Sequence, residues 1–392
     1  MKFLMSAQRF HTNQAPICKA LKEDGHEVNF FVQARGMAED HTVLVPTQMK
    51  LSLIGKLIDR HLKKKYDETT YESMLTERFI PSLWWTYREV KKYKPDVAVI
   101  RYRMPYTMVL NLACKLAGVK VRILYNQTGL YTKKNEKLSF KKKLVFSMFP
   151  KVRMTTVKIH DVFDLKYRAD EFHILPHEYF LPYVHEPNPA AENRSYFKDG
   201  VLNILDVGKY RPYKNHFVLV NAVKVMKDRG DLGDDIHFTI IGQAGAPEEI
   251  KYYEDLQARA KELSVYEYFT FRTHIPYHEM KKLYLENDVF ILTSKEEQAS
   301  IAILEAMANG LTAISTNLNG TAHYITEGSD GFFFETDNPE SLADTLKYIS
   351  DNRDQVPTWG KNALQSIKDN YTYKNYKAAL SEVLDKEFGV TL

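Results

Sequence analysis

The sequence of 392 residues contains little cysteine and no long apolar run. Its two cysteines, Cys18 and Cys114, stand far apart without metal-ligand spacing, which argues against a disulfide framework or a zinc site. No stretch approaches the roughly 18 apolar residues of a membrane span, and the apolar run at Met1–Ser6 is shorter than that of a signal peptide. We therefore expect a reduced, cytoplasmic setting.

Neither a disordered nor a fibrous composition is present. Apolar residues make up 44% of the chain and charged residues 27%, which is ordinary globular usage. A chain of 392 residues exceeds the usual size of one domain, so two domains are expected.

The net charge of +4 is unevenly distributed. Residues 1–180 contain 32 basic and 18 acidic residues, a net charge of +14, whereas the remainder contains 22 and 32, a net charge of −10. Because anionic surfaces attract lysine and arginine, the basic part suggests a membrane surface or a nucleic acid as partner.

Short apolar strands alternate with amphipathic helices along the whole chain. This alternation predicts an α/β fold of two Rossmann-like domains, residues 1–180 and 181–372, with a helix at 373–392 that crosses back to the first domain. A polar stretch with four prolines, Leu175–Asp199, marks the linker. The first domain is expected to contain strands at Lys2–Ser6, Val28–Val32, Val97–Arg101, Val121–Tyr125 and Met154–Ile159, and a helix at Tyr71–Tyr93.

Ligands of parallel sheets bind beyond the carboxyl ends of the strands, in a cleft when two such domains face each other. In the first domain this rule selects four polar residues that follow strands: His11, Arg101, Asn126 and His160. The histidines are candidate proton carriers and the arginine a candidate anion ligand. The alternatives are surface or capping histidines and a solvated arginine.

In the second domain, the segment Ser294–Gly310 carries two glutamates around a predicted helix start. Glu297 lies in the loop after a strand, and Glu305 lies on the second turn of the helix. Carboxylates accept paired hydrogen bonds from vicinal hydroxyls, and free helix N-terminal amides bind further hydroxyls or a phosphate, so the pattern suits a ribose and a sugar ring. A solvated loop acid followed by an ordinary helix-surface glutamate is the alternative.

This segment resembles the E-x7-E motif of the retaining family 4 glycosyltransferases of the GT-B fold, including the tail Glu-Ala-Met-Ala-x-Gly. Upstream, Val207–Asn215 is similar to that family's Gly-Arg-x-x-x-x-Lys-Gly segment, with Lys209 and Lys214 in the two cationic positions. The resemblance extends over most of residues 1–390 and is strongest at 200–335.

The resemblance implies a donor site in the second domain, with Glu305 on the nucleotide ribose and Glu297 on the transferred sugar. Lys209 and Lys214 would neutralise the departing diphosphate while the anomeric carbon becomes oxocarbenium-like. No cofactor and no metal are expected, since no Asp-x-Asp pair follows a strand. The remaining donor-binding residues that the resemblance implies are Arg211, Gly242, Arg272, Thr273, Gln298, Ala299, Ser300 and Ile301.

The sequence departs from the family pattern at several positions. Lys209 stands where arginine is commoner, which removes a bidentate fork that the nearby Arg211 could restore. Ser300 replaces a frequent glycine, and His323 stands where glutamate is often found. The glycine-rich loop usual after the first strand is missing.

The expected function is a retaining transfer of a hexose-type sugar from a nucleoside-diphosphate sugar to a glycan or lipid-linked acceptor, in cell-surface polysaccharide biosynthesis. A sugar-nucleotide epimerase of the same fold and a non-catalytic nucleotide-binding scaffold are the alternatives. The base, the sugar, the acceptor and the linkage depend on pocket shape, and neither they nor the oligomeric state follow from the sequence.

Two segments of the basic half, Leu51–Tyr66 and Lys133–Met154, interleave lysines with large apolar residues. Such helices can lie on an anionic bilayer, which predicts a peripheral association with the inner face of the cell membrane. Ordinary amphipathic helices with solvated lysines are the alternative. Nucleic-acid binding is not expected, because no recognition motif accompanies the charge.

Overall fold

A computed structural model of the chain describes all residues except 11–12, 35–41, 67–70, 72–73, 76–77, 127–130, 134–143, 145–146, 158–171, 175–176, 296, 298, 318–319 and 321. The chain folds into two compact units. Unit 1 comprises Met1–Thr156, Asp170–Val184 and Tyr373–Leu392, and unit 2 comprises Val157–Ala169 and His185–Thr372.

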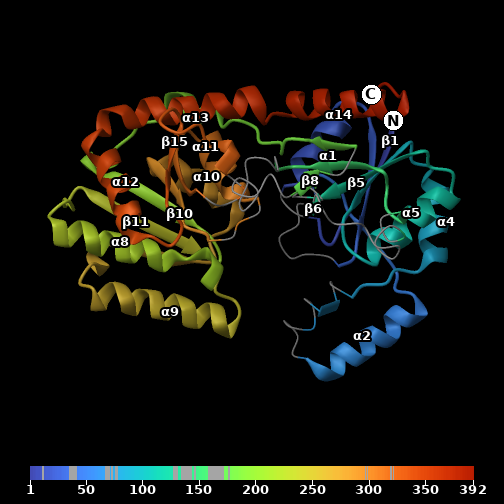
Figure 1. The fold of residues 1–392 in the computed structure, drawn as a ribbon, viewed down its shortest axis with the longest axis horizontal. Coiled ribbons are helices and arrows are strands. Elements are labelled where there is room, and N and C mark those ends of the chain that lie inside the picture. Colours follow the sequence, from blue (N-terminus) through green and yellow to red (C-terminus); the bar gives the residue numbers. More distant parts are fainter. Residues whose placement is uncertain are drawn as a thin grey trace. The chain divides into compact units, whose positions relative to one another are not determined.

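Unit 1 is built on a seven-stranded parallel sheet (Figure 1). Across the sheet the strands are β3 (Thr47–Gln48), β2 (Glu27–Val32), β1 (Lys2–Ala7), β4 (Val97–Arg101), β5 (Val121–Asn126), β7 (Val152–Thr155) and β9 (Glu178–Phe180). A separate antiparallel pair joins β6 (Tyr131–Lys133) to β8 (Phe172–Ile174).

Helices cover both faces of this sheet, because side chains alternate along each strand. On one face, Phe3 and Met5 pack with α1 (Ala15–Glu23) and α14 (Tyr373–Phe388). On the other face, Leu4 packs with α4 (Leu83–Tyr93) and α5 (Tyr106–Leu116). The C-terminal helix is therefore part of the core of unit 1.

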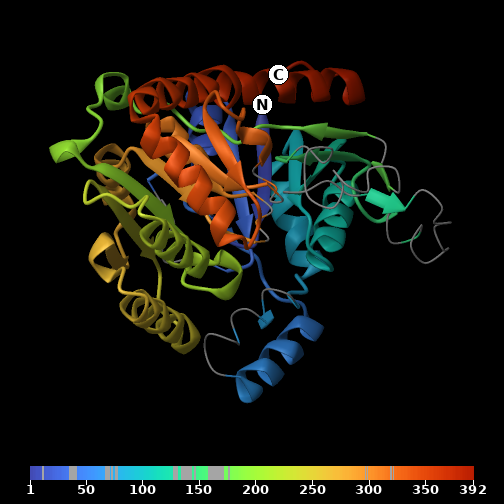
Figure 2. The same ribbon diagram turned by 60° about the vertical axis from the view of Figure 1, so that its left-hand side comes forward.

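Helix α2 (Leu53–Lys65) stands apart from this sheet, as Figures 1 and 2 show. An isolated antiparallel bridge between Leu51 and Pro81 holds the start of α2 beside the start of α4. The serine side chains at Ser52 and Ser82 accept hydrogen bonds from Gly55 N and Trp85 N and so cap the two helices.

Unit 2 contains a six-stranded parallel sheet. Its strands, in spatial order, are β12 (Phe269–Thr273), β11 (Ile236–Gly242), β10 (Leu202–Val207), β13 (Val289–Leu292), β14 (Thr312–Thr316) and β15 (Gly331–Phe334). One core joins this sheet to α8 (His216–Arg229), α9 (Pro247–Glu262), α12 (Pro339–Asp351) and the start of α13 (Val356–Asn370). Helix α11 (Ile301–Ala308) packs against β13, β14 and α13, and α10 (Tyr277–Glu286) precedes β13.

Two sequence predictions of the fold were wrong in their bounds. The helix expected at Tyr71–Tyr93 does not run through to α4, because Pro81 pairs with Leu51 and α4 begins only at Leu83. The strand expected at Met154–Ile159 begins earlier, at Val152, because Arg153 and Met154 pair with Glu178 and Tyr179 of β9, an element that the sequence pattern did not reveal.

Both cysteines are buried and unpaired. Burial raises the pKa of the Cys114 thiol to about 12, and that of the Cys18 thiol far above its usual range. Within the described residues, no helix combines the length and the apolar composition that a membrane span requires.

Candidate functional site

The predicted donor residues of unit 2 gather where its strands end. Lys209 follows β10, and a short 3-10 helix at Pro212–Lys214 then leads into α8. Glu297 lies between the end of β13 and the start of α11. Because β10 and β13 are neighbouring parallel strands, their carboxyl ends meet at one edge of the sheet.

Lys214 and Glu297 form an ion pair across this edge. Their side chains are only 12% and 18% exposed, so solvent screens the pair less than a surface pair. The two loops are also joined by their backbones, since the Lys295 amide donates to the Tyr213 carbonyl at 2.9 Å. The Gly320 amide holds Glu297 by its carbonyl at 2.7 Å. The sequence separates the two charged residues by 83 positions, and only the fold brings them together.

A buried polar network fixes the segment that carries both lysines. Asp206 lies within β10, and its Oδ2 is 3.0 Å from His216 Nδ1 and 2.9 Å from the Thr293 hydroxyl. The same hydroxyl is 2.7 Å from the Lys214 carbonyl, and His216 Nε2 lies 3.3 Å from the Lys209 carbonyl. Asp206, His216 and Thr293 are at most 1% exposed.

These three residues were not predicted from the sequence. A charged residue inside the apolar strand Leu202–Val207 is the signal that could have found them, because buried aspartates require hydrogen-bond partners. They orient the backbone of Lys209 and Lys214, and their own side chains are buried beneath it.

Two glycines, Gly208 and Gly242, allow the chain to pack closely at this edge. A Cβ at Gly242 would lie 2.2 Å from the Gly208 carbonyl oxygen, so a side chain there would separate the ends of β10 and β11. At Gly208 a Cβ would come 3.2 Å from Lys214 Cδ, which shows that the lysine stem crosses directly over this glycine. Gly242, one of the predicted donor residues, therefore serves close packing.

The two remaining cations of the segment differ. Lys209 is exposed. Arg211 donates from Nε to Glu249 Oε1 at 2.6 Å, and Oε2 of the same glutamate caps α9 by accepting from the amides of Gly245 and Ala246. Although burial acts in the opposite direction, the Arg211 guanidinium and these amides hold the pKa of Glu249 below its usual range. Arg211 is therefore already paired with a carboxylate of its own unit.

Glu305 lies on the second turn of α11, as the sequence predicted. The Tyr284 hydroxyl of α10 donates to Glu305 Oε2 at 3.0 Å, and Tyr284 is fully buried, so the carboxylate is oriented by a neighbouring helix. Ala299 and Ser300 are buried just before Ile301, the first residue of α11, and the Ser300 side chain does not cap the helix.

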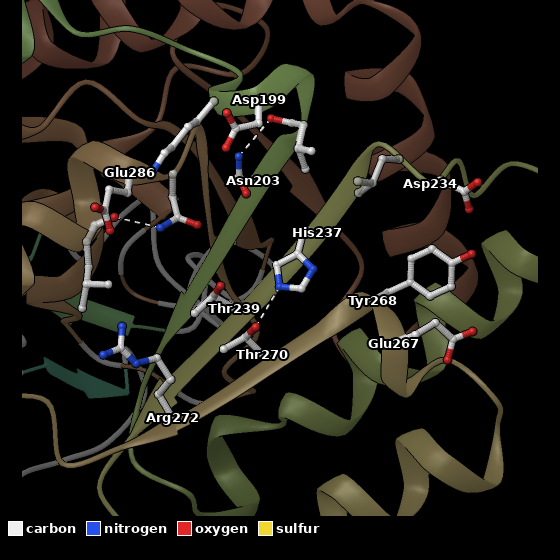
Figure 3. Close-up of a pocket in the computed structure, with 15 residues that line it drawn as sticks. Asp199, Asn203, Asp234, His237, Thr239, Glu267, Tyr268, Thr270, Arg272 and Glu286 are labelled. Atoms are coloured by element: carbon white, nitrogen blue, oxygen red, sulfur yellow. Dashed lines mark hydrogen bonds between the residues drawn. The ribbon is translucent and has the colours of Figure 1, made fainter.

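Arg272 and Thr273 end strand β12, and the Arg272 side chain lines a groove with a volume of about 550 Å³. Figure 3 shows this groove on the face of β10, β11 and β12 that carries Asn203, His237 and Thr270. His237 and Thr270 are bonded across it, with 2.9 Å between Nε2 and Oγ1. The opposite face of these strands packs on the core, so Arg272 points away from α8 and α9.

The predicted acceptor residues are only partly described. Arg101 and Asn126 are the last residues of the neighbouring strands β4 and β5, so they lie at the same edge of the sheet of unit 1. The Arg101 guanidinium stacks 4.9 Å above the Tyr125 ring. His11 and His160, as well as the predicted donor residue Gln298, lie outside the described residues.

Comparison with known proteins identifies the kind of enzyme. Residues 189–366 match the family model described as glycosyl transferases group 1. Over 337 residues the chain is 25% identical to the Escherichia coli UDP-Gal:alpha-D-GlcNAc-diphosphoundecaprenol alpha-1,3-galactosyltransferase, with 80% of this chain and 84% of that protein covered.

Solved structures agree in fold. A glycosyltransferase from Rickettsia africae superposes with a TM-score of 0.73 at 17% identity, covering 98% of both chains. Anabaena Alr3699/HepE, solved in complex with UDP-glucose, gives a TM-score of 0.67 at 13% identity over 98% of this chain and all of that one.

These matches favour a transferase over the epimerase and the non-catalytic scaffold that the sequence left open. Two parallel-sheet α/β units and structural neighbours of the GT-B type agree with the fold expected from the sequence. The chain is a glycosyltransferase of the GT-B fold, with a glycosyl transferases group 1 match at residues 189–366.

Proposed function

We propose that the chain is a retaining transferase of the family 4 type. It moves a hexose-type sugar from a nucleoside-diphosphate sugar to a glycan or lipid-linked acceptor in cell-surface polysaccharide biosynthesis. The relative from Escherichia coli supports this choice, because its name describes a UDP-sugar donor and a lipid diphosphate acceptor.

The observation that carries the proposal is the Lys214–Glu297 pair at the strand edge before α11. A diphosphate carries more negative charge than one carboxylate and so competes well for Lys214, with Lys209 exposed next to it. Glu297 would then accept hydrogen bonds from hydroxyls of the transferred sugar, and Glu305, oriented by Tyr284, from those of the ribose.

In this mechanism the lysines stabilise negative charge on the departing diphosphate, which replaces the role of a metal ion. We propose that no metal is needed. Groups of three or more potential metal-ligating side chains are not found among the described residues.

A donor screen tests the function. The full-length chain is examined by thermal shift against UDP, GDP, ADP and their common sugars, because a ligand of the folded state raises the melting temperature. We expect one nucleotide series to stabilise the protein, and the matching sugar to be transferred to N-acetylglucosamine-diphosphate-lipid with the anomeric configuration kept. Absence of stabilisation and turnover across the panel, together with an unchanged Glu305→Ala variant, would contradict the proposal.

We further propose that unit 1 associates with the cytoplasmic face of the cell membrane through α2 and the start of α4. Leu53, Ile54, Leu57 and Trp84 are 81%, 62%, 62% and 68% exposed, on helices whose starts are held together by the Leu51–Pro81 bridge. Arg60, Lys64 and Lys65 are exposed further along α2. An apolar end followed by cations suits an anionic bilayer.

Co-sedimentation with vesicles containing anionic lipid tests this association. We expect the double variant Leu53→Ser/Leu57→Ser to lose most of the binding, whereas Leu112→Ser, a 43% exposed leucine on α5, keeps it. Most residues of the second basic segment, including Lys141, Lys142 and Lys143, lie outside the described residues. Reversing those three charges tests its contribution separately.

A further inference from the structure

Unit 1 contains a pocket that neither Arg101 nor Asn126, the two described acceptor candidates, lines. It has a volume of about 560 Å³ and lies beyond the ends of β2 and β3, against α2 and the start of α4. Side chains that line it include Gln33, Gln48, Lys50, Lys56, Phe79 and Trp85. We call it the β2–α2 pocket.

Gln33 is the unusual member of this pocket. The residue is 2% exposed, and neither its side-chain nitrogen nor its side-chain oxygen has a hydrogen-bond partner within the described part of the chain. Its backbone is fixed, because its amide donates to the Gln8 carbonyl at 3.0 Å and its carbonyl accepts from Gln48 Nε2 at 3.3 Å. Buried polar groups are almost always satisfied, so this amide indicates that something else binds there.

The charge of the pocket indicates an anion. Asp59 is its acidic member, and both of its oxygens are engaged, by Lys63 Nζ at 3.2 Å and by the Tyr71 hydroxyl at 2.5 Å. Lys50 and Lys56 are exposed and have no acidic partner among the residues that the structure describes. Two exposed ammonium groups without an acidic partner among the described residues therefore line the pocket.

Aromatic side chains form part of the wall. Phe79 is 3% exposed, and the partly buried Trp85 is fixed by packing on Phe31, with 6.0 Å between the ring centres. Rigid aromatic surfaces beside amides and cations are typical of sites that bind a ring with hydroxyl and anionic substituents.

We propose that the β2–α2 pocket binds the glycosyl phosphate or diphosphate part of the acceptor. Gln33 and Gln48 exchange hydrogen bonds with sugar hydroxyls, the ring lies against Trp85, and Lys50 and Lys56 hold the phosphate. Its identification as the acceptor site rests on the proposed function. The position of α2 fits a ligand with one charged and one apolar end, because Lys56 lines the pocket while Leu53 and Ile54 are exposed one turn away.

The pocket can be tested by ligand binding, without turnover. The chain has three tryptophans, of which Trp85 lines the pocket and Trp359 lies in unit 2, so 5-fluorotryptophan labelling gives a local and a remote 19F NMR signal. We expect N-acetylglucosamine 1-phosphate to shift the Trp85 signal in a saturable way and to leave Trp359 unchanged. Methyl N-acetylglucosaminide and inorganic phosphate, each lacking half of the ligand, should bind at least about tenfold more weakly.

Variants separate the two halves of the pocket. Gln33→Met keeps the length of the side chain and should raise the Kd for N-acetylglucosamine 1-phosphate about tenfold, as expected for two lost hydrogen bonds. Lys50→Gln/Lys56→Gln should raise that Kd by a similar factor of about ten and leave the Kd of the neutral glycoside unchanged. Lys92→Gln, an exposed lysine on α4 outside the pocket, is the control.

With the soluble ligands, three outcomes would overturn the inference: no shift at Trp85, a shift equally strong with inorganic phosphate alone, or an unchanged Kd in Gln33→Met. An unaltered melting temperature and an unaltered signal of Trp84, which lies on α4 of unit 1, show that unit 1 of each variant is folded. N-acetylglucosamine-diphosphate-lipid in phosphatidylcholine vesicles tests the lipid-linked source. If plain vesicles shift Trp85 as much, the pocket binds lipid and the inference is wrong.

The same samples separate this inference from the proposed function. Stabilisation by a nucleotide and sugar transfer, without a response at Trp85, would leave the function standing and remove the pocket. A Trp85 response in a protein that binds no nucleotide would support the pocket as a ligand site and contradict the proposed function.

Discussion

The two units treat their cations differently. At the strand edge of unit 2, Lys214 is paired with Glu297 and Arg211 with Glu249. In the β2–α2 pocket of unit 1, Lys50 and Lys56 have no acidic partner within the described residues, and the Gln33 amide is unsatisfied. A charged side chain that is already paired is held in one position before a ligand binds. An unpaired charged side chain takes its final position only when the ligand binds.

This difference agrees with the tasks proposed for the two units. A reacting diphosphate must be positioned accurately, because charge stabilisation at the transition state depends on groups that are already in place. For an anionic acceptor head group that arrives from a membrane, long-range electrostatic attraction matters more than exact positioning. The net positive charge of this part of the chain provides that attraction.

The largest expected effect comes from breaking the pair in unit 2. Lys214→Ala should lower kcat about 10²- to 10³-fold, because it removes a preorganised charge from the departing diphosphate and leaves Glu297 unpaired. Steady-state kinetics with saturating donor measure this loss. The control Lys224→Ala removes a partly exposed lysine that pairs with Asp228 on α8, and its kcat should stay unchanged. If Lys214→Ala kept its kcat, the Lys214–Glu297 pair would not be needed for catalysis, and the proposed contrast between the cations of the two units would be wrong.

A smaller effect is expected from the network beneath the lysines. His216→Ala should lower the free energy of unfolding of unit 2 by roughly 2–4 kcal/mol, because it leaves the buried Asp206 carboxylate with the Thr293 hydroxyl but without its histidine partner. Fluorescence of Trp359 during urea unfolding, in a background with Trp84 and Trp85 replaced by phenylalanine, measures unit 2. His237→Ala, a partly buried histidine on β11 of the same unit, should cost much less. Equal losses of unfolding free energy in the two variants would show that the Asp206–His216–Thr293 network does not stabilise unit 2.

Unit 2 also contains a buried carboxylate, Asp330, that forms no ion pair within the described residues, so not every charge of this unit is paired. Burial raises the pKa of Asp330 from 3.8 to about 6, although the Thr326 amide donates to it at 2.7 Å. Since the folded pKa lies above the unfolded one, the stability present below pH 3.8 is lost as the pH rises through about 6.

Asp330→Asn should therefore stabilise unit 2 by roughly 1–3 kcal/mol at pH 7 and flatten its stability between pH 4 and 6. Urea unfolding at several pH values measures this. The control in unit 1 is Asp96→Asn, an exposed carboxylate that accepts from the Lys2 amide at 2.7 Å. A pH profile that is the same in the Asp330→Asn variant would contradict the assignment.

No effect is expected from removing divalent metals. If the lysines of unit 2 supply the positive charge, transfer rates before and after treatment with EDTA should agree. Loss of activity that Mg²⁺ or Mn²⁺ restores would show that the paired cations are insufficient.

Much of the fold was predictable because it depends on local pattern. The apolar run at Val97–Arg101 predicted β4 with its observed bounds, and the run at Lys2–Ser6 predicted β1 to within one residue. The helix predicted at Tyr71–Tyr93 was wrong because its periodicity concealed the pairing of Pro81 with Leu51, a contact over 30 positions that no local pattern reports.

The candidate site was predictable where residues resemble a known motif. Glu297, Glu305, Lys209 and Lys214 were named from their order and spacing, and their roles stay predictions. Asp206, His216 and Thr293 were missed, because they support the site from the core and their types are common. The β2–α2 pocket was missed for the same reason, since glutamine and lysine on separate segments have no distinctive spacing.

The sequence by itself determined the two α/β units, the strand-end positions and the identity of the charged residues, because periodicity and residue chemistry are local properties. Only the tertiary structure decided which charges are neutralised. Lys214 meets Glu297 across 83 positions of the sequence, and the Gln33 side chain is buried without a hydrogen-bond partner within the described residues. Hydrogen bonding and charge pairing depend on distances of a few ångströms, and those distances are set by folding.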